Sequence, residues 1–173
     1  MKRVGIAAAL FVVGCLGHPT LAAEPPKPAE LKVLEKFEGT WDCEIITKPA
    51  VWTPKEMREK AVEVNEMTLD GWFLHGCSKT PDGKPLVIMM NTYDPLRKKY
   101  HFWRFAGRGC EELDGQWDEA ASTLTITTDH GNGITTKAAF HVIDKDHREY
   151  NVAAKDGDGK IYLDIHGTVT RRK

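Results

Sequence analysis

Residues of this chain alternate between apolar and polar with a period of two, and this pattern constrains the fold more than any other feature. The alternating or uniformly apolar segments are rich in Thr, Val, Ile and aromatic residues, as β-strands are: residues 41–45, 62–65, 72–77, 86–93, 100–106, 123–127, 135–143, 149–154 and 161–169. Turn-forming pairs such as Asp70-Gly71, Asp94-Pro95 and Asp156-Gly157 separate them. Short strands with turns about every 8–12 residues predict an all-β sandwich or barrel joined by hairpins. No long helical segment separates the strands, which argues against a parallel α/β sheet.

One short helix is expected before the first strand. Leu31, Leu34 and Phe37 recur every three residues within residues 29–37, and Gly39 follows as a stop signal. Residues 24–28, which precede this helix, contain three prolines and predict an extended linker. The pattern therefore predicts a linker over residues 24–28 and one β domain over residues 29–173.

The first 23 residues have the layout of a secretory signal peptide. Lys2 and Arg3 precede an uncharged run over residues 4–17, which is shorter than the roughly 20 apolar residues that a membrane-spanning helix needs. Small residues follow, and cleavage is expected after Ala22 or Ala23. We therefore expect an exported protein, periplasmic or secreted. The segment Val12-Val13-Gly14-Cys15 leaves open a lipoprotein anchored through Cys15.

Charge and cysteine content narrow the function further. The formal net charge is −1 for the whole chain and −3 once Lys2 and Arg3 are removed, so no broad basic field for nucleic acid is expected. Cys43, Cys77 and Cys110 would remain in the mature domain. An oxidising compartment permits one disulfide, and the pair Cys43–Cys77 is the favoured one, with three reduced thiols as the alternative.

Four stretches, taken in order, resemble the bacterial family known as domain of unknown function 1579. They are Gly39-Thr40-Trp41 after the helix, residues 93–100 (YDPLRKKY), Gly115-Gln116-Trp117-Asp118, and the C-terminal residues 167–173 (GTVTRRK). The chain departs from the family around residues 102–109, where aromatic residues replace a more polar segment. The resemblance implies a calycin-like barrel, similar to lipocalins and fatty-acid-binding proteins. This would be a single antiparallel up-and-down barrel of about 8–10 strands, with the helix at its mouth and Trp41 buried beneath it. It implies no chemistry.

Motifs for enzymatic chemistry are missing from the sequence. No H-E-x-x-H, C-x-x-C or G-x-S-x-G is present. His166 is placed where some calycin-like barrels hold haem, but Ile165 and Val169 mark the opposite face as the inward one, so haem is not expected. We expect no metal and no cofactor, and the sequence favours a protein that is not an enzyme. A hydrolase or isomerase that uses lumen carboxylates is the weaker alternative, with Glu63, Asp94 and Glu111 as its candidates.

The aromatic content favours a small apolar ligand inside the barrel. The candidate binding residues are Trp41, Trp72, His101, Trp103 and Phe105. The last three alternate on one face of the predicted strand and therefore point the same way. The opposite face carries Arg104, which would suit an anionic group if that face were inward. The alternative is that the aromatics only fill the core of a structural or interaction module of the cell envelope.

Overall fold

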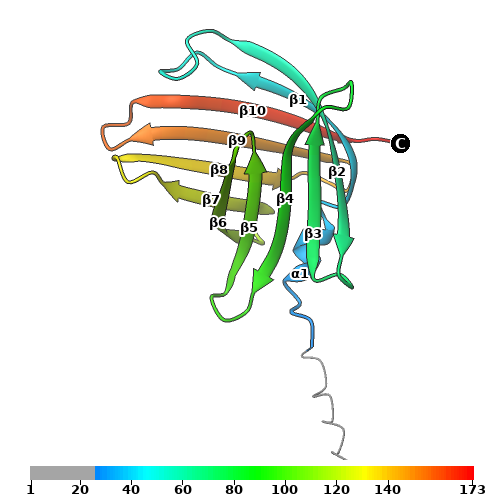
Figure 1. Ribbon diagram of the computed structural model, residues 1–173. Helices are drawn as coiled ribbons and strands as arrows, with labels where there is room; N and C mark the ends of the chain where they lie inside the picture. The colour runs from blue at the N-terminus through cyan, green and yellow to red at the C-terminus, as the bar shows by residue number, and fades with distance from the viewer. Residues whose placement is uncertain (1–25) are drawn as a thin grey trace, which may run out of the picture.

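The computed structural model describes residues 26–173, which form a closed antiparallel barrel of ten strands (Figure 1). Each strand pairs with its neighbours in the sequence, and β1 pairs with β10 to close the barrel. The predicted all-β class, up-and-down order and strand number are confirmed. The strands are β1 (Gly39–Thr47), β2 (Met57–Thr68), β3 (Phe73–Lys79), β4 (Pro85–Asp94), β5 (Lys99–Ala106), β6 (Gly109–Asp118), β7 (Thr123–Asp129), β8 (Ile134–Val142), β9 (His147–Asp156) and β10 (Ile161–Arg171).

A single short helix, α1 (Leu31–Glu35), closes one end of the barrel (Figure 1). Turns extend it on both sides, so the ordered segment matches residues 29–37, although the helix itself is shorter than predicted. Leu31, Leu34 and Phe37 are buried against residues of the surrounding strands. The side chains of Trp41 and Asn65 each donate a hydrogen bond of 3.0 Å to the carbonyl oxygen of Phe37, which fixes the end of the helical segment from inside the barrel.

Trp41 is fully buried at this end, as the sequence predicts. The guanidinium groups of Arg148 and Arg171 lie 4.0 and 4.1 Å from the centre of its ring, so cations stack on the indole. Gly39 precedes it with a φ of 122°, and a Cβ atom there would lie 2.1 Å from the Arg171 guanidinium. Only glycine fits where the chain turns from the helix into β1.

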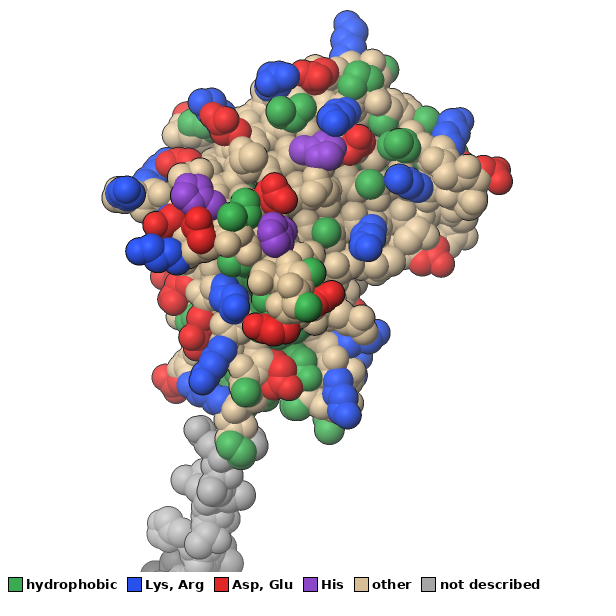
Figure 2. Space-filling model, turned by 180° about the vertical axis from the view of Figure 1, so that it is seen from behind, with side chains coloured by type: hydrophobic (Ala, Val, Ile, Leu, Met, Phe, Trp, Pro, Cys, Tyr) green, Lys and Arg blue, Asp and Glu red, His purple; other side chains and the backbone are tan. Residues whose placement is uncertain are grey.

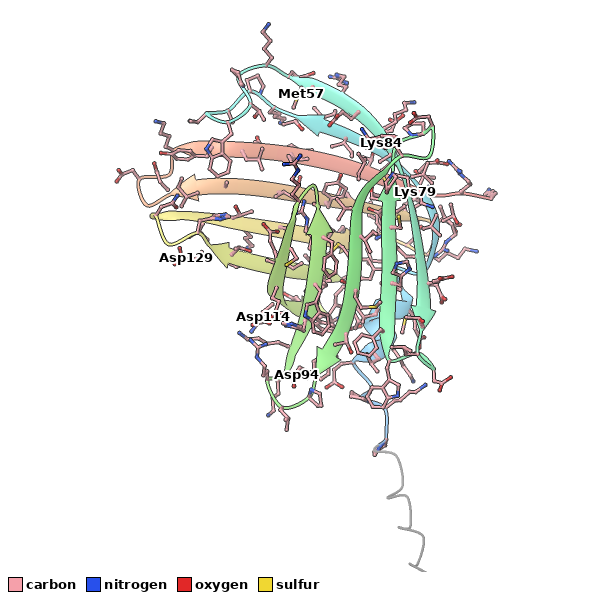
Figure 3. All side chains as sticks on the ribbon, in the orientation of Figure 1. Met57, Lys79, Lys84, Asp94, Asp114 and Asp129 are labelled. Carbon is pink, nitrogen blue, oxygen red and sulfur yellow. The ribbon has the colours of Figure 1, made fainter. Side chains whose placement is uncertain are left out.

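The two ends of the barrel differ, and we call them the capped end and the open end. The capped end holds α1 and the turns after β2, β4, β6 and β8, whereas the connections after β1, β3, β5, β7 and β9 form the open end. Figure 3 labels Asp94 at a capped-end turn and Lys84 at an open-end turn. β6 and β7 pair only between Gly115–Asp118 and Thr123–Ile126, so their remaining parts separate toward the open end.

The predictions for the N-terminal residues cannot be compared with the described part of the chain. The signal peptide over residues 1–23, the lipidation site Cys15 and the first part of the linker lie outside the described residues. Among residues 26–173, no helix is long and apolar enough to span a membrane. Figure 2 shows acidic and basic side chains interspersed over the face opposite that in Figure 1.

The predicted disulfide between Cys43 and Cys77 is wrong. Both residues are free thiols. Strand β2 separates β1 from β3, and Cys43 pairs with Ala61 while Cys77 pairs with Val64. Because Ala61 and Val64 are three residues apart on β2, the two cysteines lie on opposite faces of the wall.

Candidate ligand site in the lumen

The strand register determines which side chains face the lumen. On β1, Trp41 and Cys43 are buried and face inward, and each cross-strand partner shares its neighbour's face. When the register is followed from strand to strand, Glu63 and Asn65 of β2 face inward. It likewise turns the face of β5 that includes Tyr100, Phe102 and Arg104 inward.

The lumen contains a cavity of about 100 Å³ beneath α1. Its deep wall is apolar and is formed by Leu34, Phe37, Leu74, Met89, Phe102, Leu124, Ile126, Phe140 and Val169. Its polar lining comes from Glu63, Asn65, Ser78, Asn91, Arg148 and Tyr150. A mostly apolar lining with a few polar groups is typical of small-molecule sites, but the volume of this cavity is below the roughly 300–1,000 Å³ that is usual for them.

Arg148 and Glu63 form an ion pair at the edge of this cavity. Nη2 of Arg148 donates to Oε2 of Glu63 at 3.1 Å. The Arg148 guanidinium also stacks on Trp41 and lies 5.1 Å from the centre of the Phe37 ring. Burial lowers the pKa of Arg148, and the neighbouring Glu63 carboxylate opposes that shift. The pair places two opposite charges in the lumen with no net charge between them.

Two buried polar atoms along the cavity have no hydrogen-bond partner among the described residues. They are Nε of Arg148, a donor, and Oδ1 of Asn91, an acceptor. The two residues are 6% and 7% exposed. Buried polar groups are normally paired, and an unpaired one costs about 1–3 kcal/mol. Both atoms are inaccessible to solvent, so they are unsatisfied polar groups inside the wall of the cavity.

Cys43 and Tyr150 lie beside the ion pair. Burial, reinforced by the nearby Glu63 carboxylate, raises the pKa of the Cys43 thiol to about 12. Burial also raises the pKa of the Tyr150 hydroxyl. Both groups are therefore neutral at physiological pH and add no charge to this part of the lumen.

The structure separates the five predicted ligand residues. His101, Trp103 and Phe105 do share one face of β5, but that face is the outer one, so their predicted role in lining the lumen is wrong. His101 lines a groove on the outside of the barrel and its Nδ1 lies 3.0 Å from Oδ1 of Asp114, while Phe105 is 47% exposed.

Neither of the other two residues lines the cavity directly. Trp72, in the turn between β2 and β3, packs against the hydrophobic cluster at the capped end. Trp41 closes that end below the cavity. Arg104, the alternative inward residue, does face the lumen and pairs with Glu111 at 2.9 Å.

The carboxylates considered for catalysis do not meet. Glu63 pairs with Arg148, and Glu111 pairs with Arg104. Asp94 instead accepts hydrogen bonds from the backbone N–H groups of Leu96 and Arg97 in a turn at the capped end. Within residues 26–173, no group of three or more His, Cys, Asp or Glu side chains is arranged to hold a metal ion. His166 lies on the outer face and pairs with Asp164 at 2.9 Å.

The sequence profile of the family described as "Protein of unknown function (DUF1579)" matches residues 27–171, which include the whole barrel. The chain belongs to the DUF1579 family. No curated protein matches its sequence. The barrel that surrounds the cavity is therefore the fold of this DUF1579 member, and the family match itself adds no activity.

Two solved structures share the barrel fold at low sequence identity. Rv2717c from M. tuberculosis superposes with a TM-score of 0.59 at 13% identity, covering 86% of this chain and 100% of that one. The S-type phycobiliprotein lyase CPES from Guillardia theta gives a TM-score of 0.53 at 12% identity, covering 82% of this chain and 92% of that one. These similarities show the shared fold.

Glu63, Asn91 and Arg148 form the polar part of the site, and sequence reasoning did not assign them to it as a group. Glu63 alternates with Val62 and Val64, and it was considered only as a possible catalytic carboxylate of the lumen. In the structure Glu63 and Asn65 of β2 both face the lumen. The useful signal was the combination of polar residues on one face of β2 with Arg104 on one face of β5, which together indicate a partly polar lumen.

Proposed function

We propose that this DUF1579 protein is an exported carrier that binds a small neutral molecule in its lumen. The apolar part of the molecule would contact the deep wall, and its polar group would meet Arg148 or Asn91. The observation that carries the proposal is the cavity of about 100 Å³ along which a buried donor and a buried acceptor have no partners. Export is the expectation from residues 1–23.

The size of the cavity limits the ligand. An apolar cavity of about 150 Å³ can hold benzene. The cavity here, at about 100 Å³, is comparable, so it suits one ring or a chain of about six carbons. A longer ligand would extend toward Ser78 and Val87, which line the cavity on its open-end side. The similar lyase barrel supports this architecture as a scaffold for a functional site, while the ligand contacts come from this chain alone.

The charge balance of the lumen favours a neutral ligand over an anion. Arg148 is already matched by Glu63, so a bound carboxylate would leave one uncompensated negative charge in a buried site. A hydroxyl group, by contrast, adds no charge and can accept a hydrogen bond from Arg148 or donate one to Asn91. An alcohol is the simplest probe with both capacities.

Isothermal titration calorimetry with three six-carbon probes tests this proposal. We expect 1-hexanol to bind at least ten-fold more tightly than hexanoate or hexylammonium, because only the alcohol adds no charge. If none of the three probes binds saturably, the result contradicts ligand binding in the lumen. Tighter binding of hexanoate would retain the site and contradict the neutral ligand class. Native mass spectrometry of the protein purified from its own source would then identify the natural ligand.

The Asn91→Leu variant tests the polar contact separately. Leucine has a similar volume and removes the unpaired acceptor. The free energy of unfolding should therefore rise by about 1–3 kcal/mol, while the affinity for 1-hexanol should fall. Asn151→Leu, on the exposed outer face of β9, is the matched control and should leave binding unchanged. Loss of stability without loss of affinity in Asn91→Leu would show that Asn91 has only a structural role.

A further inference from the structure

The outer face of five adjacent strands carries a continuous apolar row. The register from β2 to β6 pairs each member with the next, and the row consists of Val64, Cys77, Ile88, Phe105 and Cys110. The register places its members on the outer face, opposite the inward-facing neighbours Asn65, Gly76 and Met89, and Cys77 also borders the lumen cavity. Ile88 and Phe105 are among the exposed large apolar residues.

A second row, one step nearer the capped end, widens this surface. It is formed by Glu66, His75, Met90, Trp103 and Glu112. Trp103 lies between Met90 and Glu112 in this row, and the centre of its ring is 6.3 Å from that of Phe73 and 4.3 Å from that of His101. We call the two rows together the outer wall. Contiguous exposed apolar surface of this kind marks interaction sites in soluble proteins.

Charges lie on opposite sides of the apolar row. Toward the open end are Lys79, Lys84 and Arg108, in or beside the turns after β3 and β5. Toward the capped end are Glu66 and Glu112, both with exposed side chains. Figure 3 labels Lys79 and Lys84 at the open end of these strands and Asp94 and Asp114 nearer the capped end, where Arg97 and Lys99 pair with Asp114.

We infer that the outer wall is the interface of a homodimer. A two-fold axis that runs along the apolar row places the row of one copy against the same row of the other. That axis also reverses the strand direction, so basic residues of one copy meet acidic residues of the other. Lys79 approaches Glu66 of the partner subunit, and Arg108 approaches Glu112 of the partner subunit. The surface is thus complementary to itself in both hydrophobicity and charge.

The size of the outer wall indicates a weak dimer. Five strands about 4.8 Å apart and six residues of about 3.4 Å along each strand cover about 500 Å² per copy, or about 1,000 Å² in total. This value is at the lower limit for specific association, and stable dimers bury more. Interfaces of this size are typical of weak, transient association, so we expect dimerisation only at micromolar or higher concentration.

Sedimentation velocity of the purified protein over a range of concentrations tests the dimer. The wild type should change from one chain to two across the micromolar range. Phe105→Glu, at an exposed position, should weaken the dimer by more than ten-fold. Leu96→Glu is the matched control on an exposed turn outside the outer wall and should leave association unchanged. Circular dichroism would verify that both variants are folded.

Chemical cross-linking tests the direction of the axis. Residues on the axis face their own copies, so a bismaleimide with a spacer of about 8 Å should join Cys110 to Cys110 and Cys77 to Cys77, with sheets about 10 Å apart. Cys43 faces the lumen and should remain unlinked. Glu112→Arg should weaken the dimer, and Arg108→Glu combined with Glu112→Arg should restore it.

A protein that stays monomeric at several hundred micromolar would overturn the inference. So would a dimer that is insensitive to Phe105→Glu, because that dimer would use another surface. Cross-links that join Cys77 to Cys110 alone would contradict the proposed axis. Binding of the monomer to neutral phosphatidylcholine vesicles, lost in Phe105→Glu, would assign the outer wall to a lipid surface and overturn the dimer.

Discussion

Two Arg–Glu pairs face the lumen of this barrel, and they have nearly the same geometry in different surroundings. Arg148 and Glu63 are 3.1 Å apart near the capped end, with side chains 6% and 26% exposed. Arg104 and Glu111 are 2.9 Å apart near the open end, with side chains 38% and 54% exposed. Distance alone would rank them as equals, so burial is what distinguishes them.

Burial has opposite consequences for the two pairs. At the open end water screens the charges, and such pairs contribute little to stability. At the capped end the charges depend on each other, because either one alone would be buried without compensation. Only the deep pair lines the cavity and leaves a donor unpaired. The capped end therefore combines the stability of the barrel with the proposed ligand site.

The largest effect is expected from breaking the deep pair. Arg148→Met should lower the free energy of unfolding by about 3–5 kcal/mol, since Glu63 would remain buried without its partner. Guanidinium chloride denaturation measures this change. Adding Glu63→Leu to Arg148→Met should recover part of the loss. A cost below about 1 kcal/mol for the single variant would place the deep pair in the same class as the exposed one.

The second-largest change in the free energy of unfolding is expected at α1, the helix that covers the capped end. Leu34→Ala should cost about 3 kcal/mol, because Leu34 is fully buried between α1 and the strands and its removal leaves a cavity. Leu96→Ala, the same change at an exposed turn residue, should stay within about 0.5 kcal/mol. Similar thermal unfolding midpoints for both variants would show that the cap does not stabilise the barrel.

The Cys43 thiol gives a pH-dependent test of the capped end. Its folded pKa of about 12 lies above the ordinary value of 9.0, so the folded state retains a proton that the unfolded chain releases. This contribution to stability is fully present below about pH 9 and is lost as pH rises toward 12. Between pH 8 and pH 10 the wild type should lose about 1.4 kcal/mol more than Cys43→Ala does. Urea denaturation at the two pH values measures the difference, and parallel losses would contradict the burial of this thiol.

The smallest effect is expected at the open end. Arg104→Met should change the free energy of unfolding by less than about 1 kcal/mol and should leave ligand affinity unchanged. Measured beside Arg148→Met under identical conditions, it is the matched control for the deep pair. Equal losses in the two variants would remove the distinction between the ends.

Much of the fold is predictable from local patterns. The alternation of residues, the regular turns and the threefold spacing of Leu31, Leu34 and Phe37 predict strands and a cap that the structure confirms. These features follow from short-range periodicity, which one sequence contains in full. The burial of Trp41 beneath the helix follows in the same way from its position after Gly39.

The orientation of the walls was harder to predict, because β2 and β5 have apolar residues on both faces. His101, Trp103 and Phe105 share a face as predicted, but the choice of side depends on the register with every other strand. The ion pair between Glu63 and Arg148 joins residues 85 positions apart in the chain. The outer wall contains apolar residues of β2 and β5, so the sequence pattern alone favours this face as the one that packs into the core.

The central claim is that the space beneath α1 is a ligand site, and methyl NMR tests it most directly. In a titration with 1-hexanol, we predict saturable shift changes in the methyl groups of Leu74, Leu124 and Ile126, which line the cavity. The methyl groups of Leu96 and Ile46, which do not line it, should remain unchanged. Shift changes confined to outer-wall methyl groups such as those of Ile88, or no saturable change at millimolar probe, would contradict the claim.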